Sequence, residues 1–401
     1  MTTGQTTGEL VVSDNLKDSQ LSYTNKPQNT RTFQFEPASF SLHLSGPDLS
    51  GAAGPEGALL VEIGSPGGLL WGSAKIGANQ LAAGYDLNCT PTGNPPAPGS
   101  LLLNIAVKAA SGGNTLLRAQ HSLTMVWIGH SGFDPAVNGY NFVNSGSAYG
   151  AVSIDRAVFD RTYGLLLGRE KFFRKMYRDI LGATVDEKGP IAHSAPLSSG
   201  LCTGMIRSTL AFYLKQANPP AHQLDPVGDT LNTIKLYHGR QLTDKALFQA
   251  AGWIIRGGPR KVFEVFKKEV LSGNKDPLAF DIGIATLKRK NFFTAIQSEG
   301  HTVVPYAFRQ SSPQSAEIFI YNPNIPASQE NYGYANAPAG EEARLTGPVI
   351  NFDLANNKYF YTDHYQSVRP NGDPTTIVAV HQSAYEKGRS AIITSIANNF
   401  I

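Results

Sequence analysis

The chain has 401 residues, 41% of them hydrophobic, which is enough to bury a large core and fits two or three domains. Charged residues make up 16%, below the roughly 25% of an average protein. The formal charge is only +3, and the densest basic stretch is the run Lys288–Lys290, so we expect no nucleic-acid-binding face. The 40 Gly and 25 Pro argue against a helical bundle and for short strands joined by tight turns.

Two cysteines, Cys89 and Cys202, do not make a disulfide framework, and we expect two free thiols. No Cys-x-x-Cys or clustered His pattern occurs, so we expect neither a metal site nor a cofactor. No run approaches 18 apolar residues, so we expect no membrane span. The first residues lack the basic and apolar regions of a secretory signal, which leaves secreted and cytoplasmic localisation both open.

The N-terminal part of the chain divides into two compositions. Residues 1–31 are rich in Thr, Ser, Asn and Gln and predict a flexible lead-in. Residues 32–150 contain short segments that alternate at period two between Gly/Pro clusters, a pattern typical of an antiparallel β-sandwich. The predicted strands are Phe33–Glu36, Phe40–Leu44, Ala58–Ile63, Leu101–Val107 and Leu116–Ile128.

The rest of the chain mixes helices and strands. Residues 151–330 predict five helices: two over 155–167 and 170–181, one beginning at Cys202, and two more over 244–255 and 259–271. Two strands follow, beginning at His301 and Ala316. Residues 331–401 predict strands over 349–354, 358–363, 376–380 and 391–396, which we expect to pack on the preceding domain as a β-rich segment. The predicted fold class is therefore α+β.

Cys202 lies between a Ser/Gly loop and an apolar helical stretch, which places its thiol in the first helical turn. Unpaired backbone N–H groups and the positive end of the helix dipole favour a thiolate there. The same N–H groups can donate to an oxyanion on an acyl carbon. By itself this segment fits a nucleophile and a buried structural cysteine equally well.

A second segment adds a base and an orienting residue. His301 begins one predicted strand, and Asn322 follows the end of the next. A hairpin of this length brings the two side chains together, and a His–Asn pair fixes the imidazole tautomer so that the other nitrogen can serve a thiol. Asn324 is the alternative orienting residue, because strand ends are poorly fixed by sequence.

Three short motifs together resemble the bacterial branch of the papain-like cysteine peptidase superfamily, over roughly residues 155–330. They are Gly200-Leu-Cys-Thr-Gly-Met, Gly300-His-Thr-Val-Val-Pro-Tyr and Ile320-Tyr-Asn-Pro-Asn. The resemblance implies a helical half carrying Cys202 as nucleophile, packed on an antiparallel sheet carrying His301 as general base and acid and Asn322 as orienting residue. The Gln that this family places before the nucleophile has no counterpart, which leaves Ser199 and the backbone N–H of Cys202 as candidate oxyanion donors.

The expected activity is hydrolysis of peptide or amide bonds through a thioester. An amidase, a transglutaminase-like acyl transferase, or a non-catalytic binding protein whose β-sandwich contacts a glycan or protein partner are the alternatives. His193 and His238 are weaker candidates for the substrate cleft. Asp276 and Asp281 lie five residues apart, but nothing in the sequence pairs them for glycoside chemistry.

Overall fold

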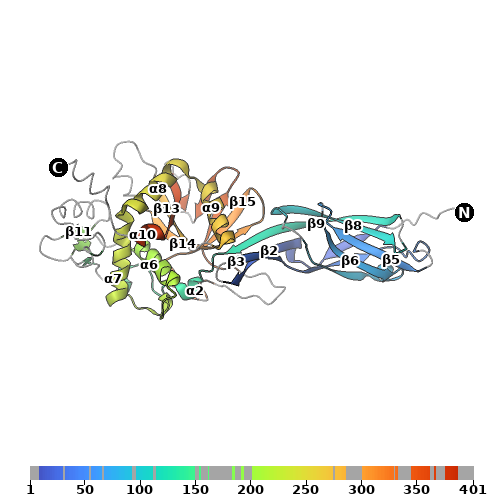
Figure 1. The fold of residues 1–401 in the computed structure, drawn as a ribbon, viewed down its shortest axis with the longest axis horizontal. Helices are drawn as coiled ribbons and strands as arrows, with labels where there is room; N and C mark the ends of the chain where they lie inside the picture. The colour runs from blue at the N-terminus through green and yellow to red at the C-terminus, as the bar shows by residue number, and fades with distance from the viewer. Residues whose placement is uncertain are drawn as a thin grey trace.

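The computed structural model describes residues 9–149 except 30–31, 54–55, 66, 93–95 and 112–113, then 153–154, 161, 183–185, 191–193, 201–285 except 274–275, 300–332 except 329, 345–361, 365–366 and 375–386. Figure 1 shows an elongated arrangement, with the early strands in one lobe and the helices and later strands in the other. The mixture of helices and antiparallel sheets confirms the α+β fold class.

The first lobe consists of two layers of strands around one apolar core. One layer has the order β1 (Val11–Asp14), β4 (Phe40–Ser45), β7 (Tyr85–Cys89), and the other contains β9 (Thr115–His130), β8 (Gly99–Ala109), β5 (Ala58–Gly64) and β6 (Leu70–Gly77). Alternate residues of β4, β5 and β8 are buried in this core, because successive side chains of a strand point to opposite faces. All five strands predicted for this lobe are confirmed within a few residues at their ends.

The prediction of a flexible lead-in over residues 1–31 is wrong for residues 11–29. These residues form β1 and β2 (Gln20–Asn29), with a short 3-10 helix, Lys17–Ser19, between them. β2 runs parallel to β9 and forms a hairpin with β3 (Thr32–Pro37). Leu21 and Tyr23 are fully buried, so this polar segment still contributes two side chains to the core beside β9.

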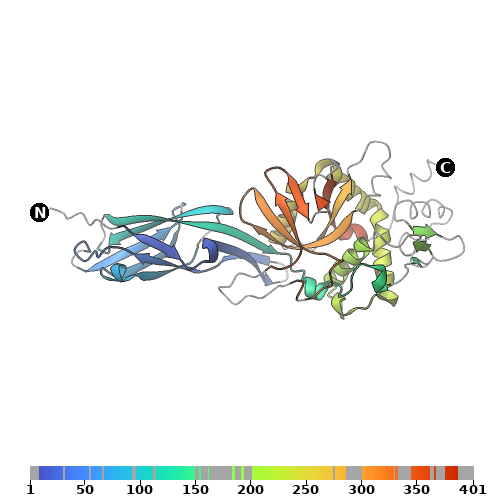
Figure 2. The same ribbon diagram turned by 180° about the vertical axis from the view of Figure 1, so that it is seen from behind.

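The long strand β9 continues from the first lobe into the second, as Figure 2 shows from behind. Its last residues pair with β14 (His301–Gln310), from Trp127 opposite Gln310 to His130 opposite Ala307. One sheet of thirteen strands in the described part of the chain therefore spans both lobes. After β9, α2 (Pro135–Asn138) and α3 (Gly146–Tyr149) precede the second lobe, and Phe133, Tyr140 and Tyr149 pack in its cores.

Helices cover both faces of the sheet in the second lobe. On one side α9 (Pro259–Ser272) packs Phe263 and Phe266 against Phe280 and Phe308. On the other, α6 (Cys202–Leu214) packs against β13 (Leu278–Ala285), β14 and β15 (Ser315–Tyr321). α7 (Gly228–Gly239), α8 (Asp244–Arg256) and α10 (Ser383–Glu386) lie beside α6 and β19. The helices predicted over 244–255 and 259–271 are confirmed as α8 and α9.

The last strands belong to the same sheet as His301 and do not form a separate layer on it. β16 (Val349–Asp353) pairs with β15, followed by β17 (Lys358–Tyr361) and β18 (Tyr365–Gln366), while β19 (Thr375–His381) pairs with β13. The small sheet of β10 (Ser153–Ile154), β12 (Ile191–His193) and β11 (Ala183–Val185) lies apart from it. Apart from residue 161, which is helical, the predicted helices at 155–167 and 170–181 and the strand at 391–396 lie outside the described residues.

Candidate functional site

Cys202 is the first residue of α6, as the sequence predicts, and its side chain is only 5% exposed. The helix approaches α7 closely at Gly204, where an added Cβ would collide with the carbonyl of Ile234 and lie 2.9 Å from the Cβ of His238. A glycine two residues after the thiol therefore lets α7 support the first turn of α6. Because the first N–H groups of a helix have no partner inside it, the Cys202 N–H is available to an oxyanion by helix geometry.

His301 and Asn322 meet in the interior of the second lobe. The Nε2 atom of His301 lies 2.8 Å from Oδ1 of Asn322, and both side chains are buried. The predicted hairpin accounts for this contact, because β14 and β15 pair Val304 with Tyr321, which places the end of β15 beside the start of β14.

The amide of Asn322 is held in a single orientation. Its Nδ2 donates to the hydroxyl of Tyr361 at 2.6 Å, and its Oδ1 accepts from the backbone N–H of Asn324 at 2.9 Å. The hydroxyl of Tyr332 accepts from the Asn322 N–H and donates to its carbonyl, each at 3.1 Å. Because Oδ1 can only accept, the neutral imidazole of His301 carries its proton on Nε2, which leaves Nδ1 as the basic nitrogen.

Asn324 does not orient His301 through its side chain. Its Oδ1 accepts from Nδ2 of Asn144 at 3.2 Å, while Oδ1 of Asn144 accepts from the N–H of Leu201 at 2.6 Å. Asn144 therefore links the residue before Cys202 to the turn after Asn322. Sequence reasoning missed Asn144, since it lies in a segment assigned to the β-sandwich and no local pattern marks it.

Hydrogen bonds connect the start of α6 to the start of β14. The hydroxyls of Thr203 and Thr302 lie 2.8 Å apart, and the backbone of Thr302 is hydrogen-bonded to the Cys202 thiol. The residue after Cys202 and the residue after His301 are thus in direct contact, which brings the two predicted segments together.

Burial dominates the electrostatics of the site. Desolvation raises the pKa of the Cys202 thiol, against hydrogen bonds from Thr302 and Thr203 that lower it. Desolvation lowers the pKa of His301, against the Asn322 hydrogen bond and the charge of Asp281. These surroundings therefore favour an uncharged thiol and an uncharged imidazole.

The other predicted site residues lie in different settings. Ser199 falls outside the described residues. The backbone of His193 ends β12, in the small separate sheet. His238 is buried in α7, where its Cβ faces Gly204, so it packs against α6. Cys89 is buried in the first lobe, where desolvation raises its pKa to about 11, and both cysteines are free, as predicted.

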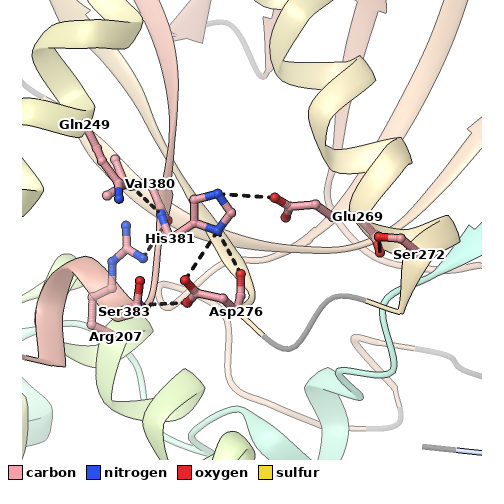
Figure 3. Close-up of polar contacts among 8 residues, drawn as sticks. All are labelled: Arg207, Gln249, Glu269, Ser272, Asp276, Val380, His381 and Ser383. Atoms are coloured by element: carbon pink, nitrogen blue, oxygen red, sulfur yellow. Dashed lines mark hydrogen bonds and ion pairs between the residues drawn. The ribbon is translucent and has the colours of Figure 1, made fainter. Parts of the chain in front are cut away.

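A second polar cluster, shown in Figure 3, lies at the end of β19. Nε2 of His381 lies 3.2 Å from a carboxylate oxygen of Glu269, and its Nδ1 lies 2.9 Å from the carbonyl of Asp276. Asp276 also accepts from the N–H of Ser383 at the start of α10. These contacts hold the strand–helix corner that places Val380, whose carbonyl accepts from Arg207 of α6 at 2.8 Å.

Within the residues that the structure describes, no group of three or more His, Cys, Asp or Glu side chains is placed to hold a metal ion. None of the described helices combines the length and apolar character needed to cross a membrane.

Comparison with known proteins gives no family assignment. No family model matches the chain, and no curated protein matches it. Three solved structures of the β-glucuronidase of Ruminococcus gnavus, one of them in complex with uronic isofagomine, match at 10–11% identity and a TM-score of 0.15. Each match covers 30–31% of this chain and 17% of the glucuronidase, so the chain spans about a sixth of that enzyme, and at this TM-score the likeness carries no argument about fold or function.

Proposed function

We propose that this protein is a cysteine hydrolase with a papain-like domain, in which Cys202 is the nucleophile, His301 the general base and acid, and Asn322 the residue that orients His301. The observation that carries the proposal is the buried hydrogen bond of 2.8 Å between His301 and Asn322, formed beside the helix start that bears Cys202. Thiol acyl chemistry uses a thiol, a base that takes its proton and a third group that orients the base, and Cys202, His301 and Asn322 would fill these roles in this proposal.

The reaction begins with transfer of the thiol proton of Cys202 to Nδ1 of His301. The thiolate sulfur then adds to the carbonyl carbon of a peptide or amide, forming the S–C bond and placing a negative charge on the carbonyl oxygen. The imidazolium returns the proton to the leaving nitrogen as the C–N bond breaks, which releases an amine and leaves a thioester. Water then adds to the thioester carbon while His301 takes one of its protons. The C–S bond breaks, the carboxylic acid leaves, and His301 returns the proton to the Cys202 sulfur.

Asn322 contributes by fixing which nitrogen of His301 is basic. With Nε2 donating to Oδ1, the ring can accept a proton only at Nδ1, and the bonds from Asn324 and to Tyr361 prevent the amide from turning over. The N–H groups of the first turn of α6, beginning with that of Cys202, are the oxyanion donors in this proposal. No cofactor takes part.

The substrate class is a peptide or amide bond, and the acceptor of the acyl group is water. Transfer to an amine in place of water would proceed through the same thioester and the same three residues. Product analysis by mass spectrometry with and without an added primary amine separates the two, because a transferase yields the amide adduct.

The proposal is tested by alkylating the intact protein with iodoacetamide and locating the label by peptide mass spectrometry. Cys202 is expected to react faster than Cys89 at neutral pH, because in this proposal His301 accepts the Cys202 proton, whereas desolvation raises the pKa of Cys89 to about 11. Cys202→Ala should abolish hydrolysis of a peptide library, and Cys89→Ala is the matched control that should retain it. Equal alkylation of the two thiols, or unchanged hydrolysis by Cys202→Ala, would overturn the proposal.

A further inference from the structure

Behind Cys202 and His301 lies a chain of polar side chains that the triad does not use. Oγ1 of Thr302 donates to Oδ1 of Asp281 at 2.7 Å and lies 2.8 Å from Oγ1 of Thr203. The three residues come from β14, β13 and α6, respectively. A carboxylate is thus joined through one hydroxyl to the helix turn that carries the thiol and to the strand that carries the imidazole.

The sheet register explains why Asp281 lies there. In the antiparallel pairing of β13 with β14, Asp281 is opposite Thr302, and Ile282 is opposite His301. The neighbours of Asp281 on β13, Phe280 and Ile282, belong to the core under α9, so alternation along the strand turns Asp281 toward α6. This is the face on which Cys202 begins its helix.

Arg207 is the charged side chain that most lowers the pKa of Asp281, and it does so without a hydrogen bond to the carboxylate. Arg207, one and a half turns after Cys202 on α6, is fully buried and lies over the ring of Tyr385 at 4.0 Å. Its Nη1 donates to the carbonyl of Val380, but its Nε and Nη2 have no hydrogen-bond partner in the described part of the chain. Arg207 therefore acts on Asp281 through its charge, and burying a carboxylate and a guanidinium without a direct bond costs stability.

We propose, resting on the proposed function, that Asp281 is a positioning residue: through Thr302 it holds the first turn of α6 against β14, and its carboxylate charge stabilises the imidazolium that His301 forms during the reaction. Asp281 touches neither the thiol nor the substrate in this account. It acts through Thr302 on geometry and through space on charge.

The electrostatics support this role. The charge of Asp281 raises the pKa of His301 and also raises the pKa of Cys202. Desolvation raises the pKa of Asp281 itself, while Arg207 and the Thr302 hydroxyl lower it and so favour the carboxylate. The titratable and charged side chains around the thiol and the imidazole come from five helices and strands: Tyr149, Arg207, Asp281, Tyr361 and Tyr385.

The test uses Asp281→Asn, which keeps an acceptor for the Thr302 hydroxyl and removes the charge, with Asp229→Asn, an exposed position on α7, as the matched control. The rate of Cys202 alkylation by iodoacetamide is followed against pH, and the His301 imidazole is followed by NMR. Both midpoints are expected to move to lower pH in Asp281→Asn, since both pKa values lose a raising charge, and to stay in place in the control.

A purely structural role predicts a different outcome. Loss of packing would change the alkylation rate without moving both midpoints in the same direction. Thr302→Val should slow alkylation by removing the hydroxyl link, and Thr302→Ser should restore it. Unmoved midpoints in Asp281→Asn, with Cys202 still more reactive than Cys89, would overturn this inference and leave the proposed function standing. Equal reactivity of Cys202 and Cys89 in the unmodified protein would overturn the proposed function itself.

Discussion

His130 makes the stability of this protein sensitive to acid. The residue ends β9, where the sheet passes from the first lobe to the second, and its side chain is 4% exposed. Desolvation lowers its pKa from 6.5 to about 4. The folded protein therefore binds the proton less tightly than the unfolded chain, in which the imidazole is hydrated.

The sign and size of the effect follow from this difference. Since the pKa is lower in the folded state, the unfolded chain binds more protons below pH 6.5, and the free energy of unfolding falls as pH decreases toward the folded pKa. One pKa unit corresponds to about 1.4 kcal/mol, so the loss contributed by His130 is about 2 kcal/mol between neutral pH and about pH 5. The contribution is fully present above the unfolded pKa.

Urea unfolding of the wild-type protein and His130→Leu at several pH values measures this contribution. The substitution should remove about 2 kcal/mol of the fall in unfolding free energy between neutral pH and about pH 5, whatever its effect at neutral pH. An equal pH dependence in wild type and His130→Leu would refute the reasoning, because it would mean that His130 does not titrate differently in the two states.

Three further variants test the site and its surroundings. Asn322→Ala should lower the unfolding free energy by about 3 kcal/mol, because it leaves several buried polar groups without their partner. It should also slow alkylation of Cys202. An unchanged unfolding free energy in urea would contradict the buried hydrogen bond to His301. Gly204→Ala should cost about 1–3 kcal/mol by forcing α6 away from α7, and a melting temperature equal to wild type would show that the helices are not in close contact there. Glu269→Gln should cost less than about 1 kcal/mol, because its ion pair with His381 is partly exposed, and a larger loss in thermal unfolding would give that pair a structural role.

Much of the local structure follows from the sequence. Alternation at period two predicts β4, β5 and β8, and the apolar periodicity after Thr243 and Gly258 predicts α8 and α9, because these patterns reflect which side chains each element must bury. The His301–Asn322 contact is also predictable, since a short hairpin brings the end of one strand to the start of the other.

Other features depend on contacts between segments far apart in the chain. β1 and β2 lie in a segment rich in polar residues, and they become strands because β4 and β9 supply their hydrogen-bonding partners. The path of β9 through both lobes depends on its pairing with β14, which no local pattern predicts. Asn144 and Asp281 reach the site across 58 and 79 residues of sequence from Cys202, and only the folded sheet places them beside it.

Cys202 itself combines both kinds of information. The sequence alone places it in the first turn of an apolar helix and predicts a free thiol. Tertiary structure decides its surroundings: burial raises the pKa of the thiol, and the Thr203–Thr302 contact joins its helix to the strand of His301. The physical reason is that helix position is a local property of a few residues, whereas desolvation and charge depend on everything that packs around the sulfur.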